Sequence, residues 1–577
     1  MRKKWFAFGC LTSFVLVIVF LLVVFHSLGN LGKKKAVKIE PSSFLELKLS
    51  GEIRDYNEFK DDFFSSPMQK KTISANDVVL KINKAAKDKN ISGIILEPNW
   101  IKSGFATVNE IISALENFKA TGKKVYAYLE MCGNKDYYLA SVADSIYLNP
   151  SASAGILLTG IGGNILFYKE LLDKLGIEMQ VIHAGKYKGA GEPFSRNQMS
   201  EPFKESVDEL FSDLYEQMLK EISRRRNIPY SQVKKIYEKR DDVFINKQNA
   251  IDLRIADELA FKEAMLEKLN INKKNLVKFS DYRMPIPSLK PDKIAVIFAQ
   301  GGISQSKSEL EENISAAKFN KILDKLEADK TVKAVVMRVN SPGGSALESE
   351  IILNKIKALK KKKPFVISMG NVAASGGYYI SCDADYIVAD PFTITGSIGV
   401  IGMFPNFNKL GTKIGIHSNV IKKGKYSTLF DPWQKPDKSV LKNFESEIKE
   451  TYAEFKNRVA EGRKLKIDKV EEIAQGRVWS SSDAFKNQLI DAEGTLDDAV
   501  KKAAELAGIS SYGKIFYPKQ KSFFELLLKE KFNIEIFSGI TNSEWEKELK
   551  FKEALQFYEM IKNDPVQAIV PADLELK

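Results

Sequence analysis

The stretch SGGYYISCDADYIVADPFTITG (Ser375–Gly396) is the most informative part of this sequence, because an earlier stretch of the chain is similar to it. The earlier one reads NKDYYLASVADSIYLNPSASAG (Asn134–Gly155), and the two align without a gap at a constant offset of 241 residues. The identical pairs include Tyr137/Tyr378, Tyr138/Tyr379, Asp144/Asp385, Pro150/Pro391 and Gly155/Gly396. Further along, GKYKG (Gly185–Gly189) aligns with GKYST (Gly424–Thr428). The chain therefore contains a duplicated domain.

The two copies differ at two chemically important positions. In the first copy Asn134 stands opposite Ser375, so only the second copy has a serine before its Gly-Gly pair. In the second copy Ser427 stands opposite Lys188, so only the first copy has the second lysine. A serine needs a base to act as a nucleophile. This reciprocal loss suggests one composite active site, in which Ser375 is the nucleophile and Lys188 a possible base.

Length and composition indicate a globular protein of several domains. A chain of 577 residues is too long for one hydrophobic core, and 44% hydrophobic with 28% charged residues is typical of a folded protein. The net charge is +13, but neither zinc-finger spacing nor an arginine-rich arm indicates nucleic-acid binding. A positive surface facing anionic lipid is at least as consistent with that charge. The three cysteines, Cys10, Cys132 and Cys382, indicate neither a disulfide framework nor a metal site.

The N-terminus predicts a membrane anchor. Three basic residues precede an apolar run, Trp5–Leu28, which is long enough to cross a bilayer core of about 30 Å. The run is longer than the apolar part of a cleaved signal peptide and lacks a clear cleavage site, so we expect residues 1–28 to be a retained tail and transmembrane helix. Residues 29–40 form a basic linker, whose lysines leave the orientation of the anchor nearly balanced.

Both copies follow the same plan of alternating strands and helices. Short β-rich runs at Ser92–Pro98 and Lys333–Val339 are each followed by a segment with helical spacing of apolar residues and by another strand. This alternation predicts α/β layers with parallel strands and right-handed crossovers. We place the first repeat at residues 41–284 and the second at residues 292–511. The linker at 285–291 lies in a stretch with three prolines in eight residues.

Residues 512–577 lie outside the duplication and are predicted to form a C-terminal extension. The stretch FFELLLKEKF, residues 523–532, is aromatic-rich and has helical spacing. The last residues, NDPVQAIVPADLELK at 563–577, are predicted to be a loose end.

Two glycine motifs of the second repeat are candidates for the active site. NSPGG (Asn340–Gly344) follows a predicted strand, and its glycines let backbone amides point at a ligand without obstruction. AASGGYY (Ala373–Tyr379) follows the next strand, which would place Ser375 at a strand-to-helix turn. There the amide of Gly376 and the N-terminus of the helix could stabilise an oxyanion.

The choice of base stays open between a lysine and a histidine. The only histidines are His26, His183 and His417, and none lies at a shared motif position, although His183 lies five residues before Lys188. A lysine can act as a base only when it is neutral, so its pKa must fall from about 10.4 by roughly three units. Burial has this effect, and the small residues of KYKGAGEPF (Lys186–Phe194) allow close packing around Lys188.

At these residues the sequence resembles the long form of the bacterial signal peptide peptidase A family, also called protease IV. The resemblance covers nearly the whole chain after the anchor. Its most specific parts are RVNSPGGS, MGNVAASGGYYIS, TGSIGVIG and IAQGRVW in the second half, and FYKELLDKLGI and YKGAGEPF in the first half.

The resemblance implies two tandem repeats with a fold similar to Clp protease and crotonase, and a serine peptidase with a Ser–Lys dyad. It implies that Ser375 is the nucleophile, that Lys188 is the general base and that Ser397 assists this lysine. The oxyanion hole is expected from the amides of Gly376 and Gly344. One departure from the family, glycines at 189 and 191 in place of bulkier residues, predicts a looser loop around the lysine.

The resemblance further implies a homotetramer in the bacterial cytoplasmic membrane, with the catalytic repeats on the extracytoplasmic side. The expected substrates are signal-peptide remnants and other apolar peptides, and no metal, cofactor or nucleic acid is expected. Two other functions stay open from the residues: a crotonase-like acyl-CoA enzyme with the same oxyanion hole, and a non-catalytic membrane scaffold. The first of these would need catalytic carboxylates and an adenine pocket, for which the sequence contains no motif.

Overall fold

A computed structural model describes residues 38–58, 72–286, 288–305, 313–520 and 566–569. The predicted anchor, Trp5–Leu28, and the predicted helical stretch at 523–532 lie outside the described residues. Within the described part, no helix is both long enough and apolar enough to cross a membrane.

The first repeat is built on a parallel sheet with the strand order β10-β7-β5-β4-β1-β11. These strands are β1 (Ser43–Gly51), β4 (Ile91–Ile101), β5 (Lys124–Leu129), β7 (Ser145–Leu148), β10 (Glu258–Leu259) and β11 (Leu276–Lys278). Its helices are α2 (Ala75–Lys87), α3 (Phe105–Lys119), α4 (Asn134–Ala140), α5 (Lys169–Leu175), α6 (Glu192–Ser195), α7 (Glu201–Arg226), α8 (Tyr230–Glu238), α9 (Lys247–Asp252) and α10 (Lys262–Lys268). Short pieces complete it: β2 (Ile53–Arg54), β3 (Ile73–Ser74), β6 (Met131–Cys132), β8 (Gly155–Ile156), η1 (Gly189–Gly191) and η2 (Lys273–Asn275).

The second repeat has the same strand order, β20-β16-β15-β13-β12-β21, with two further strands, β17 and β19, at the end of β15. Its strands are β12 (Lys293–Gln300), β13 (Val332–Ser341), β15 (Phe365–Ala374), β16 (Tyr386–Ala389), β17 (Ile394–Gly396), β19 (Val478–Ser480), β20 (Ala492–Glu493) and β21 (Gly513–Tyr517). Its helices are α11 (Ala316–Ala328), α12 (Ala346–Lys360), α13 (Gly376–Tyr379), α14 (Asn408–Lys413), α15 (Lys438–Arg463), α16 (Ile467–Ile473), α17 (Ser481–Lys486) and α18 (Leu496–Leu506). The parallel α/β arrangement expected from the sequence is thus confirmed.

The apolar runs that predicted strands are the central strands of the two sheets. In β4 and β13 the side chains are buried on both faces, as expected for parallel strands covered by helices on either side. The sheet of the second repeat also includes β21, which pairs with β12 as β11 pairs with β1. This repeat therefore extends into the residues predicted to form a separate extension, at least as far as Tyr517.

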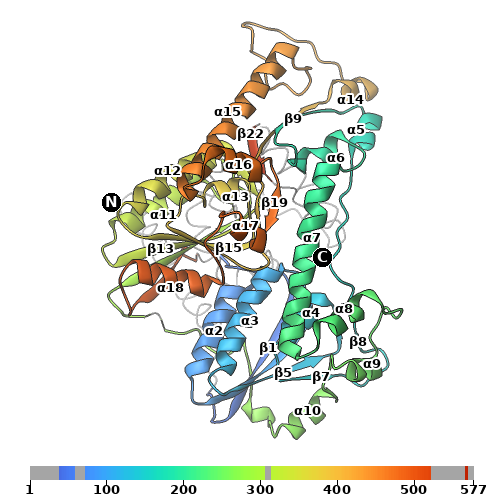
Figure 1. Ribbon diagram of the computed structural model, residues 1–577, viewed down its shortest axis with the longest axis vertical. Coiled ribbons are helices and arrows are strands. Elements are labelled where there is room, and N and C mark those ends of the chain that lie inside the picture. The colour runs from blue at the N-terminus through green and yellow to red at the C-terminus, as the bar shows by residue number, and fades with distance from the viewer. Residues whose placement is uncertain (1–37, 59–71, 287, 306–312, 521–565, 570–577) are drawn as a thin grey trace, which may run out of the picture.

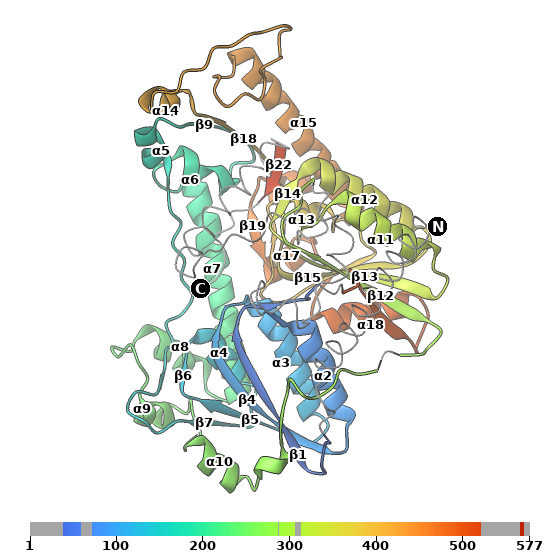
Figure 2. The same ribbon diagram turned by 180° about the vertical axis from the view of Figure 1, so that it is seen from behind.

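The two repeats pack directly on each other. Figure 1 shows the sheet of the first repeat below, the second repeat above, and α2 and α3 between them. The hydrophobic core of the first repeat continues into the second, where Phe105 of α3 stacks on Phe392 with ring centroids 5.1 Å apart. Helix α7 runs along both repeats, which Figure 2 shows from behind. A site shared between the repeats is therefore sterically possible.

A four-stranded sheet with the order β14-β22-β18-β9 joins distant parts of the chain. Its strands are β9 (Glu178–Ala184), β14 (Gly343–Ser345), β18 (Val400–Asn406) and β22 (Val566–Ile569). The prediction of a loose end at 563–577 is wrong for β22, which pairs antiparallel with β14 and β18. These partners lie far away in the sequence, so the composition of the tail alone did not indicate a strand.

Candidate active site

Ser375 lies at the turn between β15 and α13, where the sequence placed it. Its backbone has φ of 55°, a region that residues other than glycine seldom adopt, and its amide donates to the Gly396 carbonyl at 2.8 Å. Strained backbone of this kind persists where the surroundings fix it, often at functional sites. Helix α13 has only four residues. The expected contribution of a helix dipole is therefore small, because few aligned peptides add to it.

Lys188 reaches this serine from the other repeat. It lies in the loop that follows β9, directly before η1, and it is 3% exposed. Its Nζ atom is 2.6 Å from Ser375 Oγ, although the two residues are 187 positions apart in the chain. The structure therefore brings together two residues, each of which is present in only one of the repeats.

Ser397 completes the surroundings of the amine. Lys188 Nζ lies 3.0 Å from both the carbonyl oxygen and the Oγ of Ser397. A neutral amine has two N–H donors and one lone pair. When both donors point at Ser397, the lone pair is left to accept the proton of Ser375.

The protonation of the amine follows from its burial. Desolvation penalises the ammonium form, so burial lowers the pKa of Lys188 well below the ordinary lysine value of 10.5. Among the described residues no carboxylate forms an ion pair with Lys188 that would oppose this effect. The geometry thus supplies a neutral amine in contact with a serine hydroxyl.

The loop that carries Lys188 is held by the segment IAQGRVW (Ile473–Trp479) of the second repeat. Tyr187 donates its amide to the Gln475 carbonyl at 2.8 Å, and a Cβ at Gly476 would lie 2.6 Å from Lys188 Cβ. The amide of Ser397 donates to the Arg477 carbonyl at 2.6 Å. One short segment therefore positions both Lys188 and Ser397. The sequence contained this motif, but no pattern in it indicated that function.

The expectation that two glycines loosen this loop is wrong. Both Gly189 and Gly191 are buried. A Cβ at Gly189 would approach the Phe203 ring to 2.4 Å, and one at Gly191 would approach Val181 to 2.5 Å. These contacts are closer than carbon atoms can come, so the glycines permit tight packing against α7 and β9.

The SPGG turn packs against the serine turn. Gly344 has φ of 147°, and a Cβ there would lie 2.0 Å from the Ile303 carbonyl oxygen, so only glycine fits. The two glycines of the turn belong to β14, and α13 contacts both β13 and β14. This places Gly344 and Gly376 on adjoining backbone segments, which is the arrangement that an oxyanion hole with two amide donors requires.

At the equivalent position of the first repeat, Asn134 forms hydrogen bonds within that repeat. Asn134 Nδ2 donates to Thr159 Oγ1 at 2.9 Å and to the Gly160 carbonyl at 2.8 Å. The Asp136 carboxylate accepts from the amides of Gly133 and Ile101, at 2.9 and 3.0 Å. The Asp136 side chain therefore ties the turn before α4 to the end of β4, at a position where the second repeat has Gly377. The sequence showed the absence of a serine here but not these hydrogen bonds.

The histidines do not take part in the described site. His183 is exposed on β9, and its Nδ1 contacts the Gly185 carbonyl at 3.1 Å. His417 is exposed in the segment after α14, and His26 lies outside the described residues. The side chain next to the Ser375 hydroxyl is therefore Lys188 and not a described histidine.

An extended segment of the chain itself lies beside this site. Strand β22 pairs with β14 through Gly344↔Ala568 and with β18 through Ile401↔Gln567. Strand β14 contains the glycine of the SPGG turn. The edge that β22 covers is therefore one that could bind an extended peptide by backbone hydrogen bonds.

Comparisons with known proteins identify the family of this chain. The sequence profile of peptidase family S49 matches residues 117–276 and 357–510, and that of Clp protease matches residues 292–387. Protease 4 of Haemophilus influenzae is 36% identical over 526 residues, which cover 85% of this chain and 83% of that protein.

Two further relatives differ in how much of the chain they match. The chloroplastic serine protease SPPA of Arabidopsis thaliana is 33% identical over 531 residues, covering 88% of this chain and 74% of that protein. A putative signal peptide peptidase SppA of Enterococcus faecium is 38% identical over 179 residues, which cover 31% of this chain and 52% of that protein.

Fold, site and relatives together define a serine peptidase with a Clp protease-like α/β fold. The chain belongs to peptidase family S49. Neither an acyl-CoA enzyme nor a non-catalytic scaffold, the two other functions left open by the residues, is the function of that family.

Proposed function

We propose that this peptidase cuts peptides with a Ser–Lys dyad shared between its two repeats. Ser375 is the nucleophile, Lys188 the general base, and Ser397 the residue that orients the amine. The observation that carries this proposal is the 2.6 Å contact between Lys188 Nζ, which is buried, and Ser375 Oγ.

In this mechanism Ser375 Oγ attacks the carbonyl carbon of the scissile bond while its proton moves to Lys188 Nζ. The amides of Gly376 and Gly344 stabilise the negative charge on the carbonyl oxygen. When the tetrahedral intermediate collapses, the ammonium of Lys188 gives its proton to the leaving amine. The neutral lysine then activates a water molecule, which releases the acyl group from the serine.

The proposed substrates are cleaved signal peptides and other apolar peptides. A backbone edge beside the nucleophile supports binding of an extended chain, and the similarity to the signal peptide peptidase of Enterococcus faecium supports the substrate class. Apolar or small residues are expected near the cut. Faster cleavage of charged segments than of leucine- or alanine-rich peptides would argue against this substrate class.

Activity of the single and double variants tests the dyad. Ser375→Ala, Lys188→Ala and the double variant should each lose several orders of magnitude in kcat, and the losses should not add. A fluorophosphonate should label Ser375 in the wild-type protein and not in Ser375→Ala. Wild-type hydrolysis of apolar peptides by Ser375→Ala would rule out the assignment.

The proposal includes a retained anchor at Trp5–Leu28 and extracytoplasmic repeats. The length of the apolar run supports the anchor, whereas only the family resemblance supports the orientation and a homotetramer. Protease added to spheroplasts should digest the domain that contains Ser375. Its protection until the membrane is lysed would reverse the topology, and light scattering in detergent would measure the oligomeric state.

A further inference from the structure

Strand β15 is irregular directly before the nucleophile. Its pairing with β13 runs regularly to Val339↔Met369 and resumes at Ser341↔Ala373, so Gly370–Val372 bulge opposite the single residue Asn340. Bulges next to active sites bend a strand and change the direction of the following side chains. This bulge sets how the SPGG turn lies relative to Ser375, because the turn follows β13 and the serine follows β15.

A carboxylate of the first repeat fills the bulge. Asp55 Oδ2 accepts from Asn340 Nδ2 at 3.2 Å and from Arg338 Nε at 3.3 Å. A Cβ at Gly370 would lie 2.9 Å from Asp55 Oδ2, so the carboxylate occupies the space that a side chain there would need. Asp55 is only 4% exposed. A buried carboxylate in this position depends on these donors.

Asp55 also fixes the direction of the Asn340 amide. A carboxylate only accepts hydrogen bonds, so it holds the NH₂ side of Asn340 and leaves Oδ1 to accept from the Val372 amide at 3.2 Å. The Asn340 side chain thus replaces the backbone partner that Val372 lacks because of the bulge. The backbone carbonyl of Asn340 accepts from the Gly301 amide at 3.0 Å. The residue that starts the SPGG turn is therefore held on three sides.

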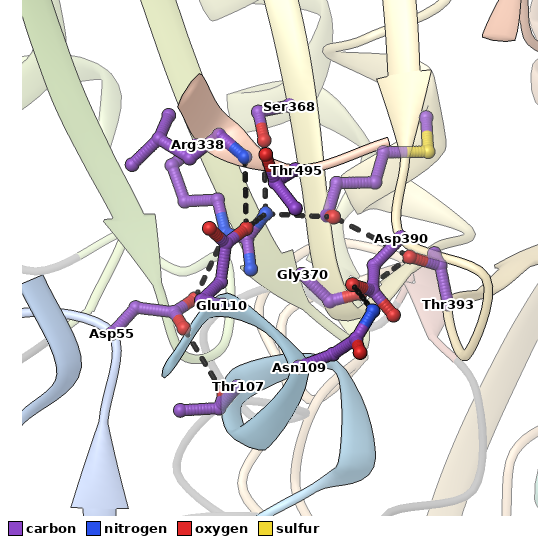
Figure 3. A network of polar contacts seen from close by, with 12 residues as sticks. Asp55, Thr107, Asn109, Glu110, Arg338, Ser368, Gly370, Asp390, Thr393 and Thr495 are labelled. Atoms are coloured by element: carbon purple, nitrogen blue, oxygen red, sulfur yellow. Dashed lines mark hydrogen bonds and ion pairs between the residues drawn. The ribbon is translucent and has the colours of Figure 1, made fainter. Parts of the chain in front are cut away.

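Helix α3 of the first repeat holds the same bulge through Thr107. Its amide donates to Asn371 Oδ1 at 3.1 Å, and its hydroxyl accepts from Asn371 Nδ2 at 2.7 Å and donates to Asp55 Oδ1 at 3.0 Å. Figure 3 shows Asp55 and Thr107 approaching Arg338 from the side of the first repeat.

The backbone around Asp55 is itself clamped to the second repeat. Gln300 donates Nε2 to the Tyr56 carbonyl at 2.9 Å and accepts from the Tyr56 amide at 3.0 Å. The Tyr56 ring stacks on Phe298 with centroids 4.5 Å apart. Asp55 is therefore placed with little freedom relative to β12 and β13.

We infer that Asp55 is a positioning residue for the peptidase reaction, which it supports by holding the oxyanion-hole turn in register with Ser375 through Asn340. This inference rests on the proposed function. The first repeat, which has no nucleophile, then contributes to the reaction in two ways. It supplies the base, Lys188, and it supports the bulge of β15 through Asp55.

A neighbouring acid provides a matched control. Glu110 pairs with Arg338 Nη1 at 2.8 Å and accepts from the Leu496 amide at 2.8 Å. It is 9% exposed, and burial raises its pKa. Loss of charge at Glu110 disturbs the same buried network without touching the bulge.

The test compares five variants of the full chain on one apolar peptide. Asp55→Ala and Asn340→Ala should each lower kcat on the order of 10²-fold, as expected when an oxyanion donor is misplaced, with KM within twofold of wild type. The double variant should be no worse than Asn340→Ala. Asp55→Asn keeps an acceptor for Asn340 and should recover most of the rate. Glu110→Gln should stay within about threefold of wild type.

A second measurement separates positioning from a general loss of structure. A peptide aldehyde forms a tetrahedral adduct with the serine, so its affinity should fall by the same factor as kcat in Asp55→Ala while KM does not change. A folded Asp55→Ala with wild-type kcat would overturn the inference, as would an equal loss in Glu110→Gln. If Asp55→Ala does not fold, a wild-type kcat in Asn340→Ala overturns it.

Phosphonate labelling keeps the two proposals distinguishable. If Ser375 of the wild-type chain is not labelled, the proposed dyad fails. If it is labelled, and Asp55→Ala is labelled at the same rate, only the positioning function of Asp55 fails.

Discussion

Asp136 and Gly377 occupy equivalent positions in the two repeats, but only the first has a side chain between the two turns that meet there. A Cβ at Gly377 would lie 2.7 Å from the Ser341 carbonyl oxygen, so no side chain fits between the serine turn and the SPGG turn. In the first repeat the Asp136 carboxylate lies at this position and accepts from the amides of Gly133 and Ile101. The two repeats therefore differ in what lies between these turns, although they share one fold.

A serine introduced into the first repeat should remain inactive. The variant Asn134→Ser in a Ser375→Ala background is expected to show no peptidase activity above Ser375→Ala alone, because the second repeat has Ser427 at the position that aligns with Lys188 and so offers no equivalent base. Phosphonate labelling followed by mass spectrometry measures this directly. Labelling at position 134 would show that a serine there reacts without a lysine equivalent to Lys188.

Activity should rise with pH as Lys188 loses its proton. Burial lowers the pKa of this amine, so the ascending limb of kcat/KM should lie well below 10.5. Lys188→Arg should be nearly inactive, since a guanidinium stays protonated. Ser397→Ala should lose less activity than Lys188→Ala, because it removes one contact of the amine and leaves the base. An active arginine variant with the wild-type profile would place the base elsewhere.

The same burial should make stability depend on pH. Between the lowered pKa of Lys188 and the unfolded value near 10.5, the unfolded chain binds a proton that the folded chain does not. Raising the pH through this window therefore stabilises the wild type relative to Lys188→Met. The stability of Lys188→Met should exceed that of the wild type most at low pH. Urea unfolding at several pH values measures the difference.

The matched control for this trend is Lys186→Met, which changes an exposed lysine of the same loop. The compared quantity is the free energy of unfolding. If its difference between wild type and Lys188→Met stays constant from about pH 6 to about pH 10, the buried amine keeps its ordinary pKa.

Removal of β22 should improve substrate binding. A peptide that pairs with β14 and β18 must displace the strand Val566–Ile569, which already covers both edges. Ending the chain at residue 565 should therefore lower KM several-fold with little change in kcat. Ending it at residue 569 keeps β22 and should leave KM unchanged. A KM that rises when β22 is removed would show that the strand is part of the binding surface.

Much of the fold could be predicted because its signals are local. The apolar runs of β4 and β13 and the helical spacing of α3 and α12 follow from the period of their side chains. The strand β22 was missed because its neighbours are far away in the chain. The close packing of Gly189 was also missed, since a glycine looks the same in sequence whether it loosens a loop or admits the ring of Phe203.

By itself the sequence determined that two α/β repeats exist and which residues each had lost. An alignment of the two copies shows that Ser375 and Lys188 each occur in only one of them, and this needs no coordinates. Only the tertiary structure decided that these two side chains meet, because distance and burial depend on the packing of one repeat against the other. The same packing removes water from the Lys188 amine and lowers its pKa. It also brings Asp55 to the bulge of β15, which no local pattern could indicate.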